Sequence, residues 1–198
     1  MKPRQSSIPP RKTTETEISL EICLDGSGQA QVQTGIGMMD HMLTLFAKHG
    51  LFDLKVSCRG DLQVDMHHSI EDLGICLGSA VLNALGDKRG INRFGFFYIT
   101  MDESLARAVV DLSGRPYLVF NAHLPPAQDS SFDYSMAQHF FKSFSDNCKA
   151  NINIELLSGN NNHHCLEAIF KAFSRALAQS CGIQHGNADD LPTTKGLL

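Results

Sequence analysis

Two pairs of adjacent histidines in this chain are spaced in a way that suits metal binding. His67-His68 and His163-His164 are each followed by glutamate in the pattern HHxxE. A lone histidine precedes each pair, His41 by 26 residues and His139 by 24. Imidazole and carboxylate are donors that zinc and transition metals accept. The doubled pattern therefore predicts a metal site rather than isolated surface or core histidines.

The helical geometry of HHxxE favours two metal ions. At about 100° per residue, the glutamate lies between its two histidines, so all three donors leave from one side of the helix. Adjacent histidines nevertheless diverge too far to bind one ion comfortably. The mixed nitrogen and oxygen donors suit manganese, iron, cobalt, nickel or zinc better than magnesium or calcium, without choosing among them. The candidate ligands are His41, His67, His68, Glu71, His139, His163, His164 and Glu167.

The elements that must position these residues also occur twice, which predicts an internal duplication. Strand patterns precede each lone histidine, and each half reads β-β-(β)-α-β-α. The expected fold is α+β, in one domain built of repeats at about 12–90 and 91–182 with a tail at 183–198. Its sheets are predicted to be antiparallel, with helices on one face. The predicted strands are Thr13–Leu24, Gln29–Gln33, Phe94–Met101, Ala106–Leu112 and Tyr117–Asn121.

The chain ends and one internal segment have weaker patterns. We expect the first dozen residues and the tail after Cys181 to be extended or mobile unless a ligand or neighbouring subunit orders them. Leu124 to Ala127 is rich in proline and is expected to be a loop.

Composition excludes several functional classes. The chain has 198 residues, 42% of them hydrophobic, which is enough for one packed domain. A net charge of −4 without a run of basic residues disfavours nucleic acid as a partner. No apolar run is long enough for a signal peptide or a membrane span. The six cysteines never form CxxC, which favours free thiols in the reducing cytoplasm.

Several segments resemble the imidazoleglycerol-phosphate dehydratase family over essentially the whole chain. They are TTETEI at Thr13–Ile18, TGIGMMDHML at Thr34–Leu43, DMHHSIEDLGICLG at Asp65–Gly78, INRFG at Ile91–Gly95, MDESLARAVVDLSGRPYL at Met101–Leu118, NNHHCLEAIFKAFSRAL at Asn161–Leu177 and PTTKG at Pro192–Gly196. Where the family usually has Ser-Thr-Lys-Gly, this chain has Thr-Thr-Lys-Gly, which keeps a hydroxyl.

The resemblance implies a split β-α-β fold, repeated twice, and a carbon–oxygen lyase. The expected reaction dehydrates imidazole glycerol phosphate to imidazole acetol phosphate in histidine biosynthesis. The expected cofactor is two Mn²⁺ per active site, with one metal drawing on first-half histidines plus a second-half partner and the other doing the converse. The expected assembly is a homo-oligomer of 24 subunits whose sites are shared between neighbours.

The resemblance also assigns roles to individual residues. Glu15 is implied as the base that removes the proton, with Glu71 and Glu167 as catalytic metal ligands. Asp72, Asp102 and Glu103 are candidates for orienting the imidazoles, and suit turns and helix starts equally well. Arginine forks match phosphate oxygens and lysine supplies a point charge. The implied phosphate-binding residues are His49, Arg93, Arg115, Thr193, Thr194 and Lys195.

Two other classes of protein remain open on the residues. A metal-storing or metal-assembled cage would use the histidines only to join subunits, but it has no need of phosphate-binding residues. A dimetal hydrolase would need a bridging hydroxide and usually a bridging carboxylate, which donors dominated by imidazole disfavour. Because the matching motifs begin by Thr13, no phosphatase-like domain is expected before them, and a single activity is predicted.

Overall fold

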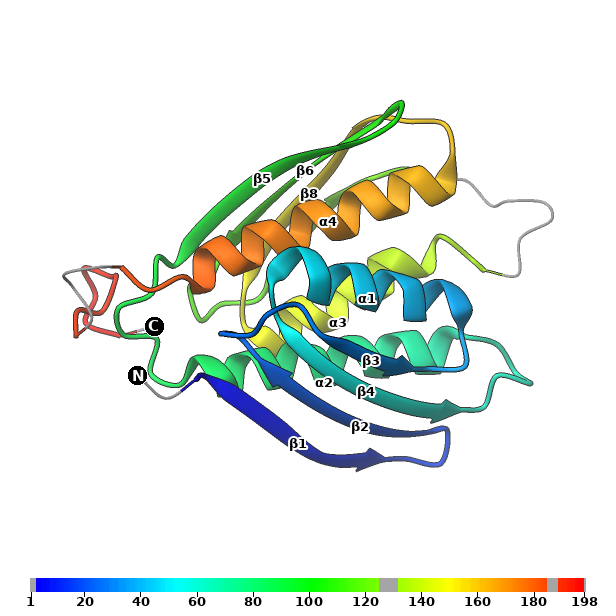
Figure 1. Ribbon diagram of the computed structural model, residues 1–198, viewed down its shortest axis with the longest axis horizontal. Coiled ribbons are helices and arrows are strands. Elements are labelled where there is room, and N and C mark those ends of the chain that lie inside the picture. Colours follow the sequence, from blue (N-terminus) through cyan, green and yellow to red (C-terminus); the bar gives the residue numbers. More distant parts are fainter. Residues whose placement is uncertain (1–2, 125–131, 185–188, 198) are drawn as a thin grey trace.

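The chain folds as two halves that repeat one order of elements (Figure 1). The computed structural model describes residues 3–124, 132–184 and 189–197. The first half contains β1 (Gln5–Lys12), β2 (Thr16–Cys23), β3 (Ala30–Gln33), α1 (Gly37–Gly50), β4 (Asp53–Gly60) and α2 (His67–Leu85). The second contains β5 (Phe94–Met101), β6 (Ser104–Asp111), β7 (Tyr117–Asn121), α3 (Met136–Cys148), β8 (Asn151–Ser158) and α4 (Asn162–Cys181). The predicted α+β class is confirmed.

Each half forms a four-stranded sheet of the same topology among the described residues, in the orders β1-β2-β4-β3 and β5-β6-β8-β7. Most neighbouring strands are antiparallel, as predicted, but β3 runs parallel to β4 and β7 runs parallel to β8. The expectation of wholly antiparallel sheets is therefore wrong. A helix lies between the two strands of each parallel pair, and this crossover returns the chain to the end of the sheet where the first strand began.

The described parts of both chain ends are held by contacts with the rest of the fold. Gln5–Lys12 pairs with β2 as an edge strand, and its register shifts between Ile8 and Arg11, where the two prolines lie. Prolines are tolerated at an edge or a bulge because they cannot donate to the ladder. In the described part of the tail, the Pro192 carbonyl accepts a hydrogen bond from Arg93. Residues 125–127 of the expected loop lie outside the described residues.

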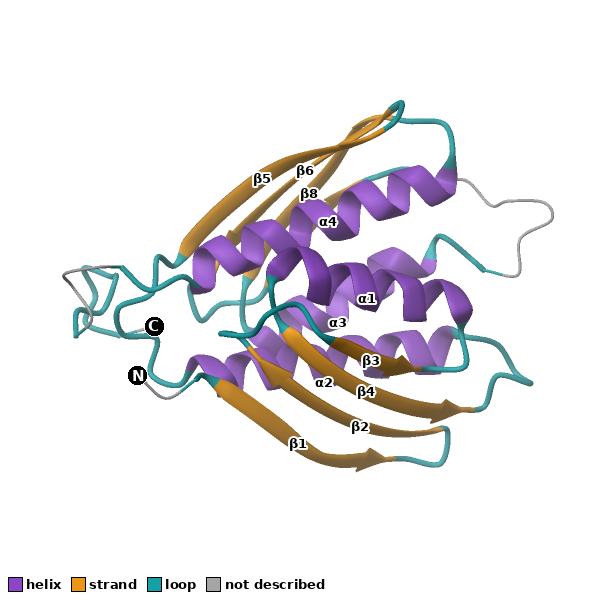
Figure 2. Ribbon diagram, in the orientation of Figure 1, coloured by secondary structure: helices purple, strands orange, loops and turns teal. Residues whose placement is uncertain are grey.

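The helices form a layer between the two sheets (Figure 2). Helix α2 covers β1 and β2, α4 covers β5 and β6, and the helices pack in the pairs α1–α4 and α2–α3. All of them run in the same direction, so their N-termini gather at one end, on the right in Figure 1. The largest fully buried side chains include Phe46, Phe52, Phe140, Phe141, Phe144, Phe170 and Phe173.

Glycines bring α2 and α3 into close contact. A β-carbon at Gly74 would lie 2.5 Å from the carbonyl oxygen of Phe140, and one at Gly78 would lie 2.5 Å from that of Phe144. Since both neighbours are backbone atoms, no side-chain rotation relieves these contacts. This close crossing holds the N-terminal histidines of α2 and α3 together.

We expect Gly78→Ala to lower the free energy of unfolding by about 1–2 kcal/mol. Overpacking costs about 1–3 kcal/mol, of which about 1 kcal/mol is offset by the helix preference of alanine. The shift in urea midpoint measures this effect. Gly37→Ala is the matched control, because nothing lies within 4 Å of a β-carbon there. Equal midpoints for the two variants would contradict the close crossing.

Candidate metal centre

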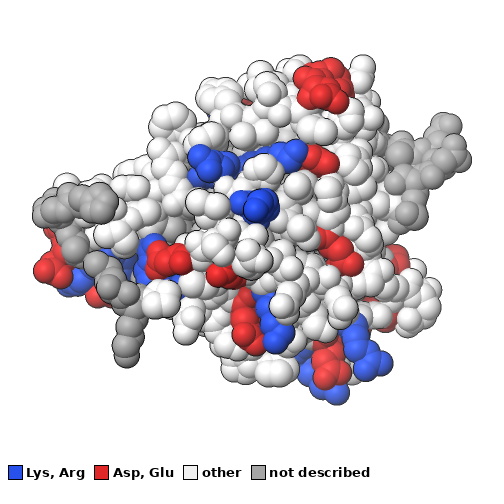
Figure 3. Space-filling model, viewed as in Figure 1, with Lys and Arg blue, Asp and Glu red and all other residues white. Residues whose placement is uncertain are grey.

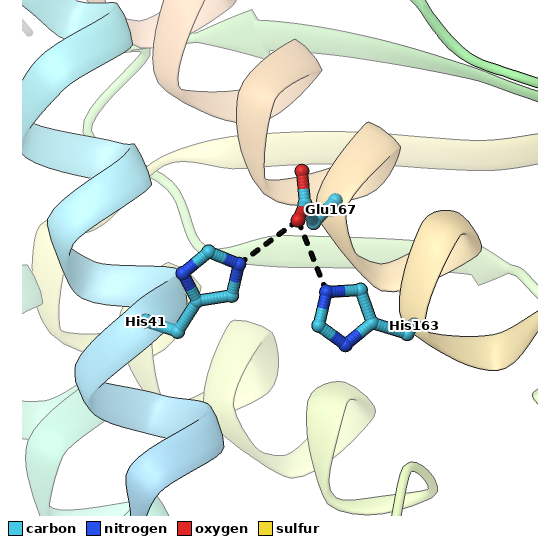
Figure 4. Close-up of side chains that lie close together, drawn as sticks. All are labelled: His41, His163 and Glu167. Atoms are coloured by element: carbon cyan, nitrogen blue, oxygen red, sulfur yellow. Dashed lines mark hydrogen bonds and ion pairs between the residues drawn. The ribbon is translucent and has the colours of Figure 1, made fainter.

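Three predicted ligands from different halves meet at the N-terminal ends of α1 and α4 (Figure 4). His41 Nε2 lies 2.9 Å from Glu167 Oε1, and His163 Nε2 lies 3.1 Å from the same oxygen. The imidazoles of His41 and His163 stack with their ring centroids 5.4 Å apart. Their three donor atoms lie within 4.8 Å of one another, the one such group in the part of the chain that the structure describes. We call this group cluster A.

The carboxylate of cluster A is held ionised. Burial opposes ionisation of Glu167, but hydrogen bonds from Lys171, His41 and His163 outweigh it and lower the pKa of Glu167 to about 2. Lys171 binds Oε2 and leaves Oε1 to the two imidazoles. The sequence motifs do not single out Lys171, although its place four residues after a glutamate on a helix is the spacing of a favourable ion pair.

A second group of predicted ligands lies where α2 meets α3. The imidazoles of His67 and His139 have their centroids 4.5 Å apart, and Glu71 follows one turn along α2. We call these three residues cluster B. Within one chain, α2 and α4 do not bring their HHxxE motifs together. Each instead brings its first histidine to the lone histidine of the other half.

The second histidine of each pair points away from its cluster. His68 Nδ1 lies 3.0 Å from Asp61 Oδ2, and His164 Nδ1 lies 2.9 Å from Glu103 Oε2. These hydrogen bonds raise the pKa of His68 and of His164. The two histidines of each HHxxE motif therefore have different partners within one chain, in agreement with the expectation that adjacent imidazoles diverge too far to bind one ion. Adjacent side chains diverge on a helix, and nearby carboxylates hold the second imidazole.

The three acidic residues suggested for orienting imidazoles have different places. Glu103 contacts His164 directly, whereas Asp102 Oδ2 lies 3.9 Å from the same nitrogen and is largely exposed. Asp72 has no hydrogen bond or ion pair with an imidazole of the described residues. It accepts a hydrogen bond from Thr16 and pairs with Arg11 at 2.8 Å, so it joins α2 to the first sheet.

A pocket of about 560 Å³ at the opposite end of the molecule brings together most of the predicted phosphate-binding residues. Arg93 is fixed there by an ion pair with Asp111 at 2.7 Å and by the bond to the Pro192 carbonyl. Backbone amides and cationic side chains in such a pocket suit an oxyanion. The lining residues are Arg93, Ser113, Gly114, Arg115, Pro192, Thr193, Thr194, Lys195 and Leu197.

His49, the remaining predicted phosphate-binding residue, does not line this pocket. It lies near the end of α1, where burial and the charges of Lys171 and Arg175 lower its pKa. Figure 3 shows lysine and arginine side chains gathered over α1 and α4 on this face. Because Lys171 also contacts Glu167, this cationic surface continues from cluster A.

A cluster of imidazole and carboxylate donors can hold a catalytic metal ion, and the cationic groups beside it can bind an oxyanion, which is the combination expected of an enzyme site. The family model described as imidazoleglycerol-phosphate dehydratase matches residues 34–177. The relative of that name from Heliobacterium modesticaldum is 50% identical over 188 residues, covering 95% of this chain and 96% of the relative. The one from Caldanaerobacter subterraneus is 49% identical with the same coverage.

Solved structures agree with this match. The enzyme of that name from Staphylococcus aureus superposes with a TM-score of 0.79 at 39% identity, covering 91% of this chain and 98% of that one. The structure from Pyrococcus furiosus has a TM-score of 0.82 at 33% identity, covering 96% and 100%. This chain belongs to the imidazoleglycerol-phosphate dehydratase family.

Proposed function

We propose that this chain is a manganese-dependent hydro-lyase that converts imidazole glycerol phosphate to imidazole acetol phosphate in histidine biosynthesis. Its family membership supports the reaction, and the curated relatives carry the dehydratase name over nearly their whole length. The observation that carries the proposal is cluster A, where two imidazoles and an ionised carboxylate converge beside a cationic surface.

The donor sets fit manganese. Cluster A offers two nitrogens and one carboxylate oxygen, a mixed set that manganese accepts and that contains no thiolate. Cluster B offers the same donor types from His67, His139 and Glu71. We assign one Mn²⁺ to each cluster, with His68 and His164 completing the clusters of neighbouring subunits. When bound, the two ions would supply Lewis-acid stabilisation to the substrate imidazole and its departing hydroxyl.

Protein groups would hold the substrate and move its proton. The proton to be removed lies on a carbon without an adjacent carbonyl, so a positioned base is needed. Glu15 suits this role because its side chain is half exposed and lies 3.6 Å from His68 Nε2. The substrate phosphate would contact Lys171 and His49 on one subunit and the Arg93–Lys195 pocket of another.

The separation of the two sites supports active sites shared between subunits. Arg93 donates its backbone N–H to Ser180 near the end of α4, whereas His163 lies at its start. At 1.5 Å per residue, these points are about 25 Å apart along the helix. The short glycerol chain of the substrate cannot span that distance. We infer that the phosphate pocket serves a metal cluster on a neighbouring subunit.

The outer faces of the two sheets also favour a homo-oligomer. The first sheet presents polar residues such as Glu17, Glu21 and Lys55. The second sheet presents large apolar side chains that would be covered in an assembly. We propose that this chain forms the 24-subunit shell that the family resemblance implies. The exposed residues are Phe94, Phe96, Tyr98, Val109, Tyr117 and Leu157.

We also propose a cytoplasmic location. All six cysteines lie within the described residues and are free thiols, as a reducing compartment favours. Among the described helices, none combines the length and apolarity needed to cross a bilayer.

Metal removal tests the proposed function. We expect purified protein loaded with Mn²⁺ to form imidazole acetol phosphate, and chelation to abolish turnover until Mn²⁺ is restored. Native mass measured alongside separates an enzyme from a metal-assembled cage. A shell that dissociates on chelation without ever having dehydratase activity supports the cage, and unchanged activity after complete metal removal contradicts the metal dependence.

A further inference from the structure

The duplication places two glutamates in equivalent positions. Glu15 directly precedes Thr16, the first residue of β2, and Glu103 directly precedes Ser104, the first residue of β6. Thr16 pairs with Gly60 at the end of β4. Leu105 pairs with Ser158, which sets Ser104 opposite Gly159 in the matching place.

Contacts at the two glycines confirm the equivalence. A β-carbon at Gly60 would meet the side chains of Ser69 and Thr16, and one at Gly159 would meet those of Cys165 and Ser104. Ser69 and Cys165 each directly follow an HH pair. The residues after these glycines, Asp61 and Asn160, therefore occupy equivalent positions too.

The two halves hold the second histidine with different members of this set. In the second half, Glu103 Oε2 accepts from His164 Nδ1 at 2.9 Å, and its other oxygen accepts from the backbone N–H of Asn161 at 3.1 Å. Asn160 has no carboxylate to offer. In the first half, Asp61 takes the equivalent place at His68 Nδ1, at 3.0 Å.

Glu15 is consequently not needed as the hydrogen-bond partner of His68 Nδ1. Its backbone carbonyl accepts from the Asp61 N–H at 3.0 Å, which fixes the loop, while its carboxylate lies 3.6 Å from His68 Nε2. In both halves the carboxylate on Nδ1 favours the tautomer that carries its proton there and leaves the lone pair of Nε2 for a metal.

We propose that Asp61 and Glu103 are equivalent positioning residues for the second histidine of each pair, and that in the first half Asp61 fills the place that Glu103 fills in the second, instead of Glu15. This exchange frees the first-half glutamate for the substrate. The inference deepens the proposed function and rests on it, because the positioned histidines are its metal ligands and Glu15 is its base.

Transferring the first-half arrangement of carboxylates to the second half tests the role of Glu103. We expect Glu103→Gln to weaken Mn²⁺ binding by about 10–100-fold, measured by calorimetric titration of the full-length metal-free protein with MnCl₂. Adding Asn160→Asp recreates the first-half arrangement and should recover at least half of that loss on a logarithmic scale. A residue that only supports the fold would not be rescued from this position.

Asp102→Asn is the matched control for charge. It removes a carboxylate from the same hairpin, and asparagine tolerates the positive φ of 49° at this position. We expect its Mn²⁺ affinity to stay within about threefold of wild type, because this carboxylate is largely exposed and lies 3.9 Å from His164 Nδ1, where exposed charges interact weakly. Glu103→Gln behaving like Asp102→Asn, or a double variant without recovery, overturns the proposal.

The reverse substitution tests the exchange of roles. Asp61→Asn recreates the second-half arrangement, so Glu15 should move to His68 Nδ1 as Glu103 does at His164. We expect Mn²⁺ affinity to stay within about threefold of wild type while kcat falls by about a hundredfold, since the base is diverted. Wild-type kcat, or a loss of Mn²⁺ affinity beyond about tenfold, overturns the exchange. Failure of the wild-type protein to bind Mn²⁺ or dehydrate the substrate would instead count against the proposed function.

Discussion

Glu15→Gln is expected to lower kcat by about a hundredfold to ten-thousandfold, the range for loss of a positioned general base. Glutamine keeps the size of the side chain but cannot accept the proton. The loop should stay intact because it is fixed by backbone bonds, from the Glu15 N–H to the Thr13 hydroxyl and from the Asp61 N–H to the Glu15 carbonyl. Steady-state turnover at saturating substrate measures the effect.

The matched control is Glu17→Gln, two residues further along the chain in β2. Glu17 pairs with Lys12 and its side chain is half exposed on the outer face of the sheet. We expect this variant to keep wild-type kcat, and both variants to keep wild-type Mn²⁺ affinity. If Glu15→Gln turned over substrate within about threefold of wild type, a range far below the loss of a general base, the base would have to be another group.

The repeated order of helices and strands was predictable because it depends on local sequence patterns. Strand alternation and the HHxxE helices recur in each half, and both signals depend only on near neighbours in the chain. Strand direction was not predictable in the same way. The polar, alternating β3 resembles an antiparallel edge strand, but the helix that follows it dictates parallel pairing with β4. In β1, two prolines interrupt the alternation, and a register shift accommodates them.

The donor types of the candidate site were predictable and the resemblance implied that each site mixes ligands of both halves, whereas the individual pairs of ligands were not predictable. The pairing of His41 with Glu167 joins residues 126 positions apart, and it depends on how α1 packs against α4. Local spacing could not reveal it. Asp61 lies seven residues before His68 across a loop, a separation without helical or strand periodicity. The recurrence of a residue directly after a strand-ending glycine in both halves is the signal that identifies it.

Mixing two inactive variants should restore activity if the active sites are shared. His163→Ala removes a ligand of cluster A, and the double variant Arg115→Ala with Lys195→Ala removes cations from the phosphate pocket about 25 Å away. Each variant alone should have almost no activity at low substrate concentration. When the two are co-expressed with different tags and purified through both, a site is intact only if both contributing subunits carry the native residues. Random mixing at equal amounts then gives about a quarter of wild-type activity.

The control mixes two variants of one cluster, His163→Ala and Glu167→Ala. Both residues lie on α4 of the same subunit, where His163 Nε2 lies 3.1 Å from Glu167 Oε1. Every cluster A in the mixed assembly therefore lacks one of the two residues. No activity should return. The contrast between the two mixtures is the decisive measurement, because both contain two defective chains in equal amounts and differ only in whether the defects lie in one subunit's site. If neither mixture recovers activity, the active sites are not shared between subunits. The substrate phosphate would then have to bind a group closer to cluster A than the pocket, and the surface formed by Lys171 and His49 is the nearest.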